Sequence, residues 1–291
     1  MNIFIDGAEG TTGLQLEQKL SALDGINLMK LGDDRRKDIN ARREYLNGSD
    51  AAFLCLPDAA AREAVSLVNN PKTVIIDAST AHRTAYGWAY GFPELSEEHY
   101  RAAAESNRIS VPGCHASGFN ALVYPLIKAG IVDRSERLTC TSLTGYSGGG
   151  KAMIADYENG DNPRRGARPY ALGLTHKHLP EMRHVCGLEH PPIFQPIVTD
   201  VRQGMLVSVP LAKNAELIWE TLNRHYGGNI SVMPLNVCDA LGMEEMNGND
   251  GMEIFVFGGT NQTLLTARFD NLGKGAAGAA VQCLKIRRGI Q

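Results

Sequence analysis

The sequence predicts an α/β protein with two domains: a doubly wound parallel sheet over residues 1–113 and an α+β domain over residues 114–271. In the first part, short and almost continuously apolar runs alternate with helical patterns, as in a sheet that helices cover on both faces. In the second part, strand patterns follow one another with one clear helix between them. The length of 291 residues accommodates two domains of ordinary size.

The individual elements follow from these patterns. In the first domain we predict strands at 2–5, 26–31, 51–57 and 73–79, with helices at 10–23 and 58–70. In the second we predict a helix at 214–228 and strands at 138–146, 191–200, 204–211, 230–235, 252–259 and 263–270. The segment FGGTNQ predicts a hairpin between the last two strands. The tail, residues 272–291, is rich in small residues, and we expect it to be a helix that rejoins the first domain.

The composition excludes several classes of function. The net charge is −3, so no basic excess points to nucleic acid or to a membrane surface. The chain has no apolar run long enough to span a membrane, and its first residues, MNIFIDGAEG, do not resemble a signal peptide. We therefore expect a cytoplasmic protein whose six cysteines are thiols.

The glycine-rich segment DGAEGTTG joins the first predicted strand to the first helix. Its glycines have the spacing G-x-x-G-x-x-G, at Gly7, Gly10 and Gly13. Glycine permits a tight turn, a close approach of pyrophosphate to the backbone, and close packing of the helix on the sheet. The helix N-terminus offers N–H groups to a phosphate, and Thr11 and Thr12 add hydroxyl donors. The segment predicts a dinucleotide site; a plain strand-to-helix turn is the alternative.

The residues after the second strand bear on the choice between NAD and NADP. An acidic residue at this place favours the ribose 2′-hydroxyl of NAD, and Asp33 and Asp34 are candidates. Arg35 and Arg36 follow, and two guanidinium groups can hold the 2′-phosphate of NADP. We favour NADP(H) because of this pair; the alternative is a solvated charged loop.

Cys114 is the candidate nucleophile. The turn residues Pro112 and Gly113 precede it, and a helical apolar pattern begins just after it. A helix N-terminus lowers the pKa of a thiol, as does a nearby imidazolium. Cys55 and Cys140 instead lie inside strand patterns, where cysteine acts as a small hydrophobic residue.

The segment LGLTHKHLPEM supplies His176 and His178 as candidate acid/base partners. Their i, i+2 spacing predicts one shared face of an extended segment. His115 is adjacent to Cys114 but is expected to point elsewhere. A zinc site is the alternative for the histidine- and cysteine-rich stretch that holds His176, His178, His184, Cys186 and His190. Its spacings match no familiar zinc site, so we expect no metal.

Two further segments are candidates for binding anions. Arg83 follows the fourth strand, where ligands of doubly wound sheets lie, and an arginine there can hold a phosphate or carboxylate. A surface salt bridge is its alternative role. The run Gly148, Gly149, Gly150 and Lys151 could cradle an anion through backbone N–H groups, or it could be a flexible connection.

Together these segments resemble the aldehyde dehydrogenases that act through acyl phosphates, and among them the shorter form of the N-acetyl-γ-glutamyl-phosphate reductase family. The resemblance rests on DGAEGTTG, IDASTAHR, YGFPEL, VPGCHASGFNAL, GYSGGGK, THKHLPEM and DNLGKGAAGAAVQ, which are spread over almost the whole chain. Longer-form relatives typically carry His-Arg-His before Pro-Glu, whereas this chain has His176-Lys177-His178.

The resemblance implies a Rossmann-type NADP-binding domain and, at residues 114–271, a catalytic and oligomerisation domain of the semialdehyde dehydrogenase type. It implies NADPH-dependent reduction of N-acetyl-γ-glutamyl phosphate, in arginine biosynthesis, through a thioester on Cys114. It favours His176 as the acid/base and implies a homodimer or homotetramer. It also implies that Arg83 lies near the substrate phosphate and that the cofactor contacts include Ser79, Asn271 and Gly273.

Three alternatives remain open. An aspartate-semialdehyde dehydrogenase, or another acyl-phosphate reductase, would keep the reaction and change the substrate. A cysteine hydrolase or acyltransferase without a cofactor would leave DGAEGTTG unexplained. A non-enzymatic NADP-sensing module would bind the dinucleotide equally well without Cys114.

Overall fold

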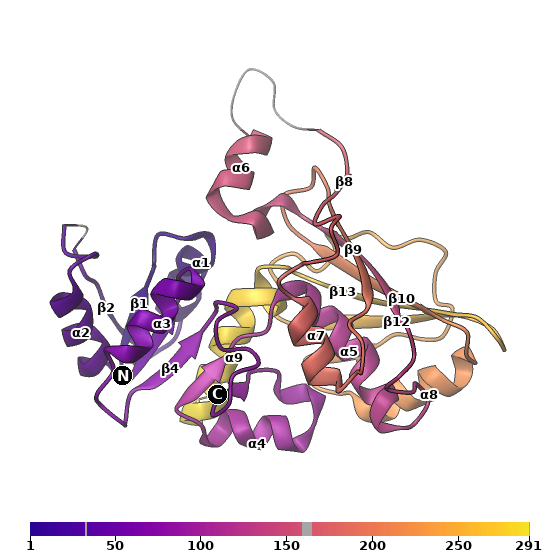
Figure 1. Ribbon diagram of the computed structural model, residues 1–291, viewed down its shortest axis with the longest axis horizontal. Helices are drawn as coiled ribbons and strands as arrows, with labels where there is room; N and C mark the ends of the chain where they lie inside the picture. The colour runs from indigo at the N-terminus through magenta and orange to yellow at the C-terminus, as the bar shows by residue number, and fades with distance from the viewer. Residues whose placement is uncertain (33, 159–164, 291) are drawn as a thin grey trace. The chain divides into compact units, whose positions relative to one another are not determined.

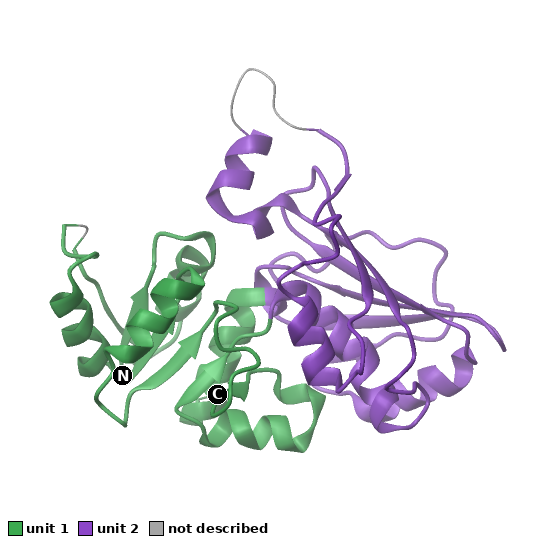
Figure 2. Cartoon of the chain, viewed as in Figure 1, with its two compact units in different colours: residues 1–112, 276–291 green, residues 113–275 purple. Residues whose placement is uncertain are grey.

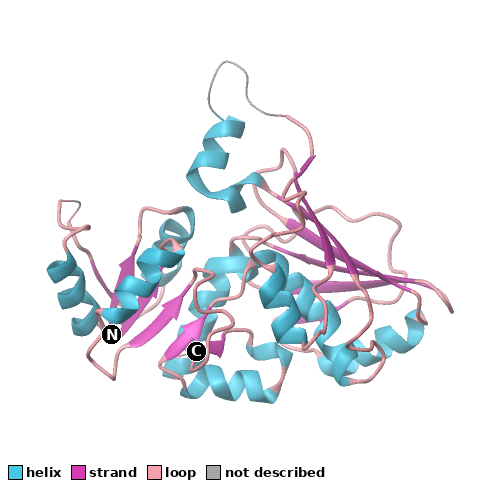
Figure 3. Cartoon of the chain, in the orientation of Figure 1, coloured by secondary structure: helices cyan, strands magenta, loops and turns pink. Residues whose placement is uncertain are grey.

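The computed structural model describes residues 1–32, 34–158 and 165–290. The chain divides into two compact units, one formed by residues 1–112 and 276–291 and the other by residues 113–275 (Figure 2). Each unit combines helices with a β-sheet (Figure 3), which confirms the predicted α/β class.

The first unit contains a sheet whose described strands are all parallel. In spatial order they are β2 (Asn27–Met29), β1 (Asn2–Asp6), β3 (Ala51–Leu54), β4 (Val74–Asp77), β6 (Arg108–Ser110) and β5 (Ala89–Tyr90). All residues of β3 and β4 are buried. Alternate side chains enter two separate cores, so Phe53 and Ile76 lie in one and Leu54 and Ile75 in the other. The predicted sheet with two covered faces is therefore confirmed.

The helices of the first unit come from both ends of the chain (Figure 1). They are α1 (Thr11–Ser21), α2 (Ile39–Gly48), α3 (Asp58–Ser66), the 3₁₀ turn η1 (Pro93–Leu95), α4 (Glu97–Glu105) and α9 (Gly278–Arg288). The sequence patterns did not single out α2 or α4, although both have a side-chain cap. Asp38 accepts the Asn40 N–H at 2.8 Å, and Ser96 accepts the His99 N–H at 3.3 Å.

The second unit contains a mixed sheet. In spatial order its described strands are β11 (Ile230–Val232), β12 (Met252–Gly258), β13 (Thr263–Phe269), β10 (Met205–Leu211), β7 (Thr139–Thr144), β9 (Ile193–Val198) and β8 (Arg168–Pro169). Strands β12 and β13 are antiparallel with Gly258 opposite Thr263, which confirms the predicted hairpin.

Helix α5 (Cys114–Lys128) packs on strands β10 and β13 of this sheet. A Cβ atom at Gly118 would lie 2.5 Å from Val207 Cγ2, so glycine permits the close approach of helix to sheet. The remaining elements are the 3₁₀ turn η2 (Tyr146–Gly149), α6 (Gly150–Glu158), α7 (Leu179–Cys186), α8 (Ala215–His225) and the π-helical turn η3 (Gly273–Ala277). None of the helices in the described ranges is both long and apolar enough to span a membrane.

Candidate active site

The glycine-rich turn lies between β1 and α1, and two of its glycines are required by the surrounding backbone. A Cβ at Gly7, where φ is +89°, would lie 2.4 Å from the Cys55 carbonyl oxygen. A Cβ at Gly13 would lie 2.4 Å from the Gly7 carbonyl oxygen, so the third glycine lets α1 close on the turn. At Gly10 the nearest atom would be 3.5 Å away, an ordinary contact. The fold of this unit therefore does not demand glycine at residue 10.

Two features of this turn bear on its capacity to accept a ligand. The space beside Gly10 suits a close approach of a ligand to the backbone. The buried Thr11 hydroxyl oxygen has no hydrogen-bond partner among the described residues, and Thr12 shares the first turn of α1. Buried hydroxyl groups are normally paired, so Thr11 has hydrogen-bonding capacity for a ligand.

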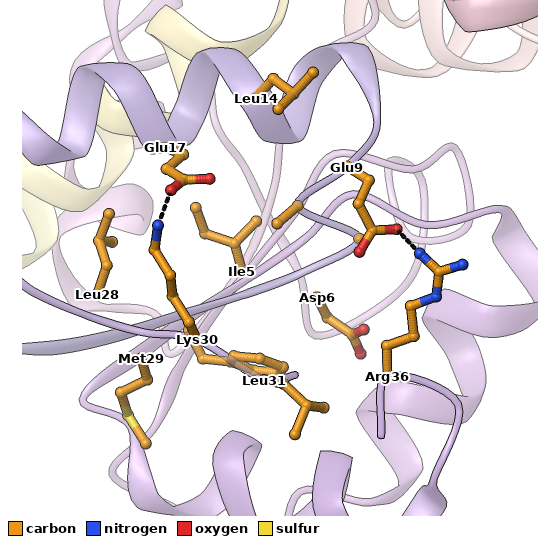
Figure 4. A pocket seen from close by; sticks show the side chains of 13 residues that line it. Ile5, Asp6, Glu9, Leu14, Glu17, Leu28, Met29, Lys30, Leu31 and Arg36 are labelled. Atoms are coloured by element: carbon orange, nitrogen blue, oxygen red, sulfur yellow. Dashed lines mark hydrogen bonds and ion pairs between the residues drawn. The ribbon is translucent and has the colours of Figure 1, made fainter. Parts of the chain in front are cut away.

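A cavity of about 220 Å³ extends from this turn along β2 (Figure 4). Its walls come from the end of β1, the glycine-rich turn, α1, and the segment that follows β2. Two ion pairs connect the α1 side with the β2 side: Glu17 with Lys30, and Glu9 with Arg36 at 2.6 Å. Arg36 therefore lines the cavity, and its charge is paired with that of Glu9 in the glycine-rich turn.

The structure separates the two arginines that the sequence grouped together. Arg35 is not among the residues that line the cavity, and its guanidinium lies 4.0 Å from the exposed carboxylate of Glu44. Asp33, the acidic candidate for a ribose contact, lies outside the described residues. Of the two arginines, Arg36 is thus the one that lines this cavity.

A buried ion pair that the sequence patterns did not reveal fixes the start of the glycine-rich turn. Asp6 closes β1 and accepts two hydrogen bonds from the Arg42 guanidinium of α2, at 3.0 and 2.9 Å. Arg42 also reaches Glu63 at 2.6 Å. No local periodicity signals this contact, because Asp6 and Arg42 are far apart in the sequence.

Arg83 lies in a turn that a buried carboxylate organises. Asp77, at the end of β4, accepts hydrogen bonds from the hydroxyl of Ser79 at 2.7 Å and pairs with His82 Nδ1 at 2.6 Å. The Arg83 guanidinium donates to the carbonyl oxygens of Val111 at 2.9 Å and Ala78 at 3.1 Å. Ser79 is therefore engaged within the turn, and Arg83 is held to the backbone that leads to Cys114.

Cys114 is the first residue of α5, as the sequence predicted for the start of a helix. It is partly exposed. Burial raises the pKa of Cys55 to about 12, and it also raises the pKa of Cys140 and Cys186, so these thiols stay protonated. No disulfide joins any of the six cysteines, all of which lie in the described ranges. Its place at the start of a helix thus distinguishes Cys114 from all three, and its partial exposure distinguishes it from the buried Cys140 and Cys186.

Glu181 is a site residue that the sequence analysis missed. Its carboxylate is 2% exposed and accepts the Gly113 N–H at 2.8 Å. The contact joins α7 to the N-cap of α5, directly before the thiol. The only sequence signal was the Pro-Glu that follows His178, and no spacing rule connects it to Cys114.

The two predicted histidines lie side by side, with ring centroids 4.8 Å apart. The predicted extended conformation is wrong, because His178 has φ −86° and ψ −10° and forms the N-cap of α7. Pro180 favours a helix start at this point. The His178 N–H donates to Nδ1 of His176 at 3.2 Å and closes the turn before α7.

His115, which the sequence set aside, joins this histidine pair. Its ring centroid lies 5.3 Å from that of His176 and 5.5 Å from that of His178. Burial, followed by the nearby charges of His176 and Lys177, lowers the pKa of His115 to about 3. His115 therefore stays neutral, whereas His176 is partly exposed.

Acid is expected to destabilise the second unit through His115. Unfolding returns the imidazole to its ordinary pKa of 6.5, so below that pH the unfolded chain binds a proton that the folded chain does not. Stability is thus lost as the pH falls from 6.5 towards 3, by about 2 kcal/mol at pH 5. Urea unfolding of wild type and His115→Gln at pH 7 and pH 5 measures this contribution. His184→Gln, at an exposed position of α7, is the control. An equal loss of stability in wild type and His115→Gln would contradict the assignment.

The other predicted ligand residues are integrated into the second unit. Gly149 ends η2 and Lys151 is exposed in the first turn of α6, so this run is a regular turn followed by a helix. Asn271 is buried; its amide accepts the Gly204 N–H at 2.9 Å and donates to the Ser147 hydroxyl at 3.1 Å. A Cβ at Gly273 would lie 2.3 Å from the Asn249 carbonyl oxygen.

The histidines and cysteines near α7 do not form a metal site. Across residues 1–32, 34–158 and 165–290, no group of three or more His, Cys, Asp or Glu side chains is arranged to hold a metal ion. Cys186 instead points to the Asn120 side chain, with Sγ 3.3 Å from Oδ1.

Two family models match the chain. The model described as "Semialdehyde dehydrogenase, NAD binding domain" matches residues 2–103, and the model described as "Semialdehyde dehydrogenase, dimerisation domain" matches residues 114–271. The N-acetyl-gamma-glutamyl-phosphate reductase 2 of Nostoc sp. is 44% identical, over 99% of this chain and 97% of that protein. The protein of the same name from Pseudomonas putida is 43% identical, over 99% and 96%.

Solved structures share the fold at lower sequence identity. Aspartate semialdehyde dehydrogenase II from Vibrio cholerae matches with a TM-score of 0.73 and 18% identity, over 98% of this chain and 97% of that chain. The enzyme from Francisella tularensis matches with a TM-score of 0.73 and 14% identity, over 99% and 100%. The semialdehyde dehydrogenase fold is therefore shown for both units.

Proposed function

The chain belongs to the N-acetyl-γ-glutamyl-phosphate reductase family, and from this premise we propose that it reduces N-acetyl-γ-glutamyl phosphate to N-acetylglutamate semialdehyde, with NADPH as reductant and release of phosphate. The observation that carries the proposal is the position of Cys114, a partly exposed thiol at the start of a helix in the unit that holds the paired rings of His176 and His178.

The chemistry of an acyl phosphate suits these residues. The Cys114 thiolate attacks the acyl carbon, a C–S bond forms, the bond from carbon to the phosphate oxygen breaks, and phosphate leaves a thioester behind. A bound reduced nicotinamide supplies the hydride that the reduction requires. His176 exchanges the proton of the sulfur, because the neutral, buried His115 takes up a proton only at much lower pH. His178 supports the turn that holds His176.

Arg83 remains the proposed ligand of the substrate phosphate, with Gly149 and Lys151 as further proposed anion contacts. Two backbone carbonyl oxygens orient the Arg83 guanidinium, and an oriented guanidinium binds a phosphate with less loss of side-chain freedom. For Ser79, Asn271 and Gly273 we propose a role in shaping the cofactor site. The side chains of Ser79 and Asn271 already form hydrogen bonds within their own units.

An aspartate-semialdehyde dehydrogenase is the competing proposal. The comparison of the two is made in the phosphorolytic direction, with NADP⁺, phosphate and either N-acetylglutamate semialdehyde or aspartate semialdehyde. We expect NADPH to form with the N-acetylated aldehyde. Turnover of aspartate semialdehyde alone would overturn the proposed substrate.

We propose that NADP is preferred over NAD and that Arg36 carries this preference. Arg36→Ala should weaken binding of NADPH about 10- to 100-fold, because a charge-assisted contact to the 2′-phosphate is lost, and should change NADH binding little. The matched control is Arg35→Ala, since that guanidinium does not line the cavity. Quenching of protein fluorescence measures both affinities. Equal losses for NADPH and NADH would remove Arg36 from this role.

A homo-oligomer, either a dimer or a tetramer, is also proposed. The printed description of the model that matches residues 114–271, a dimerisation domain, supports this assembly. Light scattering at several protein concentrations distinguishes a dimer from a tetramer.

A further inference from the structure

A hydrogen-bonded chain begins one residue after the proposed nucleophile. His115, in the first turn of α5, contacts the Ser142 hydroxyl of β7 through Nδ1 at 2.8 Å. Its other ring nitrogen, Nε2, contacts the Tyr170 hydroxyl at 2.8 Å. Tyr170 follows β8, and its backbone N–H donates to the Pro196 carbonyl oxygen of β9 at 3.0 Å. Three separate elements of the second unit thus meet on one imidazole.

The direction of hydrogen-bond donation from Ser142 through His115 to Tyr170 follows from which donors can find an acceptor. A neutral imidazole has one N–H donor and one acceptor nitrogen. Ser142 is fully buried, and His115 is the one side-chain hydrogen-bond partner of its hydroxyl among the described residues. If Nδ1 carried the proton, the Ser142 O–H would be buried without an acceptor, which is unfavourable. Ser142 therefore donates to Nδ1, and the His115 proton on Nε2 is donated to the Tyr170 oxygen.

Because the Tyr170 oxygen accepts from His115, the phenolic proton of Tyr170 is not used in this hydrogen bond. Burial raises the pKa of the Tyr170 hydroxyl, and the negative charge of the nearby Cys114 thiolate raises it further. The phenol thus remains protonated, within electrostatic range of the sulfur. Among the described residues its hydroxyl forms a hydrogen bond with no side chain except His115, so it is able to donate to a third group.

We propose that Tyr170 donates a hydrogen bond to the carbonyl oxygen of the acyl group while Cys114 attacks it, and that Ser142 and His115 are positioning residues that hold Tyr170 as a donor. As the C–S bond forms, the carbonyl π bond opens and negative charge gathers on the carbonyl oxygen. That electron pair then re-forms the C=O bond while the C–O bond to phosphate breaks, and the charge leaves with the phosphate. Tyr170 keeps its proton throughout. Preorganised donors aimed at such an oxygen are among the strongest contributors to acyl-transfer rates. This inference rests on the proposed function.

The acylation of Cys114 isolates this step, because it needs no nucleotide. The full-length protein is mixed with N-acetyl-γ-glutamyl phosphate and quenched in acid, and the mass of the intact protein gives the rate of adduct formation. Tyr170→Phe should slow acylation about 100-fold, as expected for the loss of one donor to the oxyanion. Tyr157→Phe, which removes another phenol of the same unit that contacts Arg168, should acylate at the wild-type rate.

A double-mutant cycle tests whether Ser142 acts through Tyr170. Ser142→Ala should slow acylation about fivefold, the net worth of one hydrogen bond, when Tyr170 is present. In the Tyr170→Phe background, Ser142→Ala should not slow acylation further, because Ser142 affects the rate only through the Tyr170 hydroxyl. Ser208→Ala is the control, since that hydroxyl contacts Thr266 elsewhere on the sheet. A purely structural role for Ser142 would give the same loss in both backgrounds.

The conservative variant of His115 gives an independent readout. His115→Leu removes both ring nitrogens and should slow acylation of Cys114 as much as Tyr170→Phe does. His115→Gln keeps an N–H that can donate to the Tyr170 oxygen, and it should recover part of the rate. Thermal melting curves identify any variant that does not fold.

The outcomes separate this inference from the proposed function. If wild type forms no adduct on Cys114, the proposed reductase activity is overturned, and so is the proposed role of Ser142, His115 and Tyr170. If wild type acylates but folded Tyr170→Phe does so at the same rate, Cys114 chemistry stands and the role of Tyr170 is overturned. If the Ser142→Ala loss persists in the Tyr170→Phe background, the positioning role is overturned.

Discussion

Replacing Cys114 by serine is expected to abolish acylation and to lower turnover about 10³-fold or more. Serine keeps the size of the side chain and its place at the start of α5. Its hydroxyl, however, ionises far less readily than a thiol, so a helix N-terminus that favours a thiolate does not generate a comparable alkoxide. The NADPH oxidation rate and the intact mass after exposure to the acyl phosphate measure the two effects.

The control is Cys238→Ser, which changes another partly exposed cysteine that lies in a loop. It should retain wild-type turnover and the acyl adduct. NADPH binding, followed by fluorescence quenching, should be close to wild type in both variants, because the glycine-rich turn belongs to the other unit. An adduct that persists in Cys114→Ser would assign the nucleophile to a different residue.

Replacing His176 by asparagine is expected to lower turnover by about 10²–10⁴-fold, the usual contribution of a general acid/base. Asparagine is the appropriate change, because its side-chain oxygen can still accept the His178 N–H that closes the turn before α7. The substitution therefore removes the titratable ring while it preserves the local hydrogen bond. The pH profile of kcat should lose one ionisation.

His178→Asn is the matched comparison. His178 is 4% exposed and forms the N-cap of α7, so we expect its loss to cost thermal stability and to lower turnover less than His176→Asn does. If His178→Asn alone cripples a protein that still melts like wild type, the acid/base is His178. Steady-state kinetics and melting curves of the two variants decide between them.

Much of the fold was predictable because it depends on local periodicity. The continuous apolar runs of β3 and β4 predicted a sheet covered on both faces, and the FGGTNQ turn predicted the hairpin between β12 and β13. Helices α2 and α4 were missed because both are short and most of their residues are polar or small, although Asp38 and Ser96 cap them. A cap indicates where a helix begins, but it does not by itself predict one.

The site was predictable only in part. Motif position predicted that the glycine-rich turn precedes α1 and that Cys114 begins α5. Spacing, however, misassigned the conformation of the His176–His178 segment, where Pro180 favours a helix start. Adjacent arginines also look equivalent in a sequence. The structure pairs Arg36 with Glu9 at the cavity and turns Arg35 towards Glu44, because neighbouring side chains in a turn point in different directions.

The sequence by itself determined the α/β class, the turn that opens α1 and the placement of a thiol at the start of α5, since each depends on residues within one short segment. Only the tertiary structure decided that Glu181 holds Gly113 and that one imidazole joins Ser142 to Tyr170. Those partners come from separate strands and helices, and they meet only because packing brings the ends of those elements together. Hydrogen bonds between such distant residues leave no periodic trace in the chain.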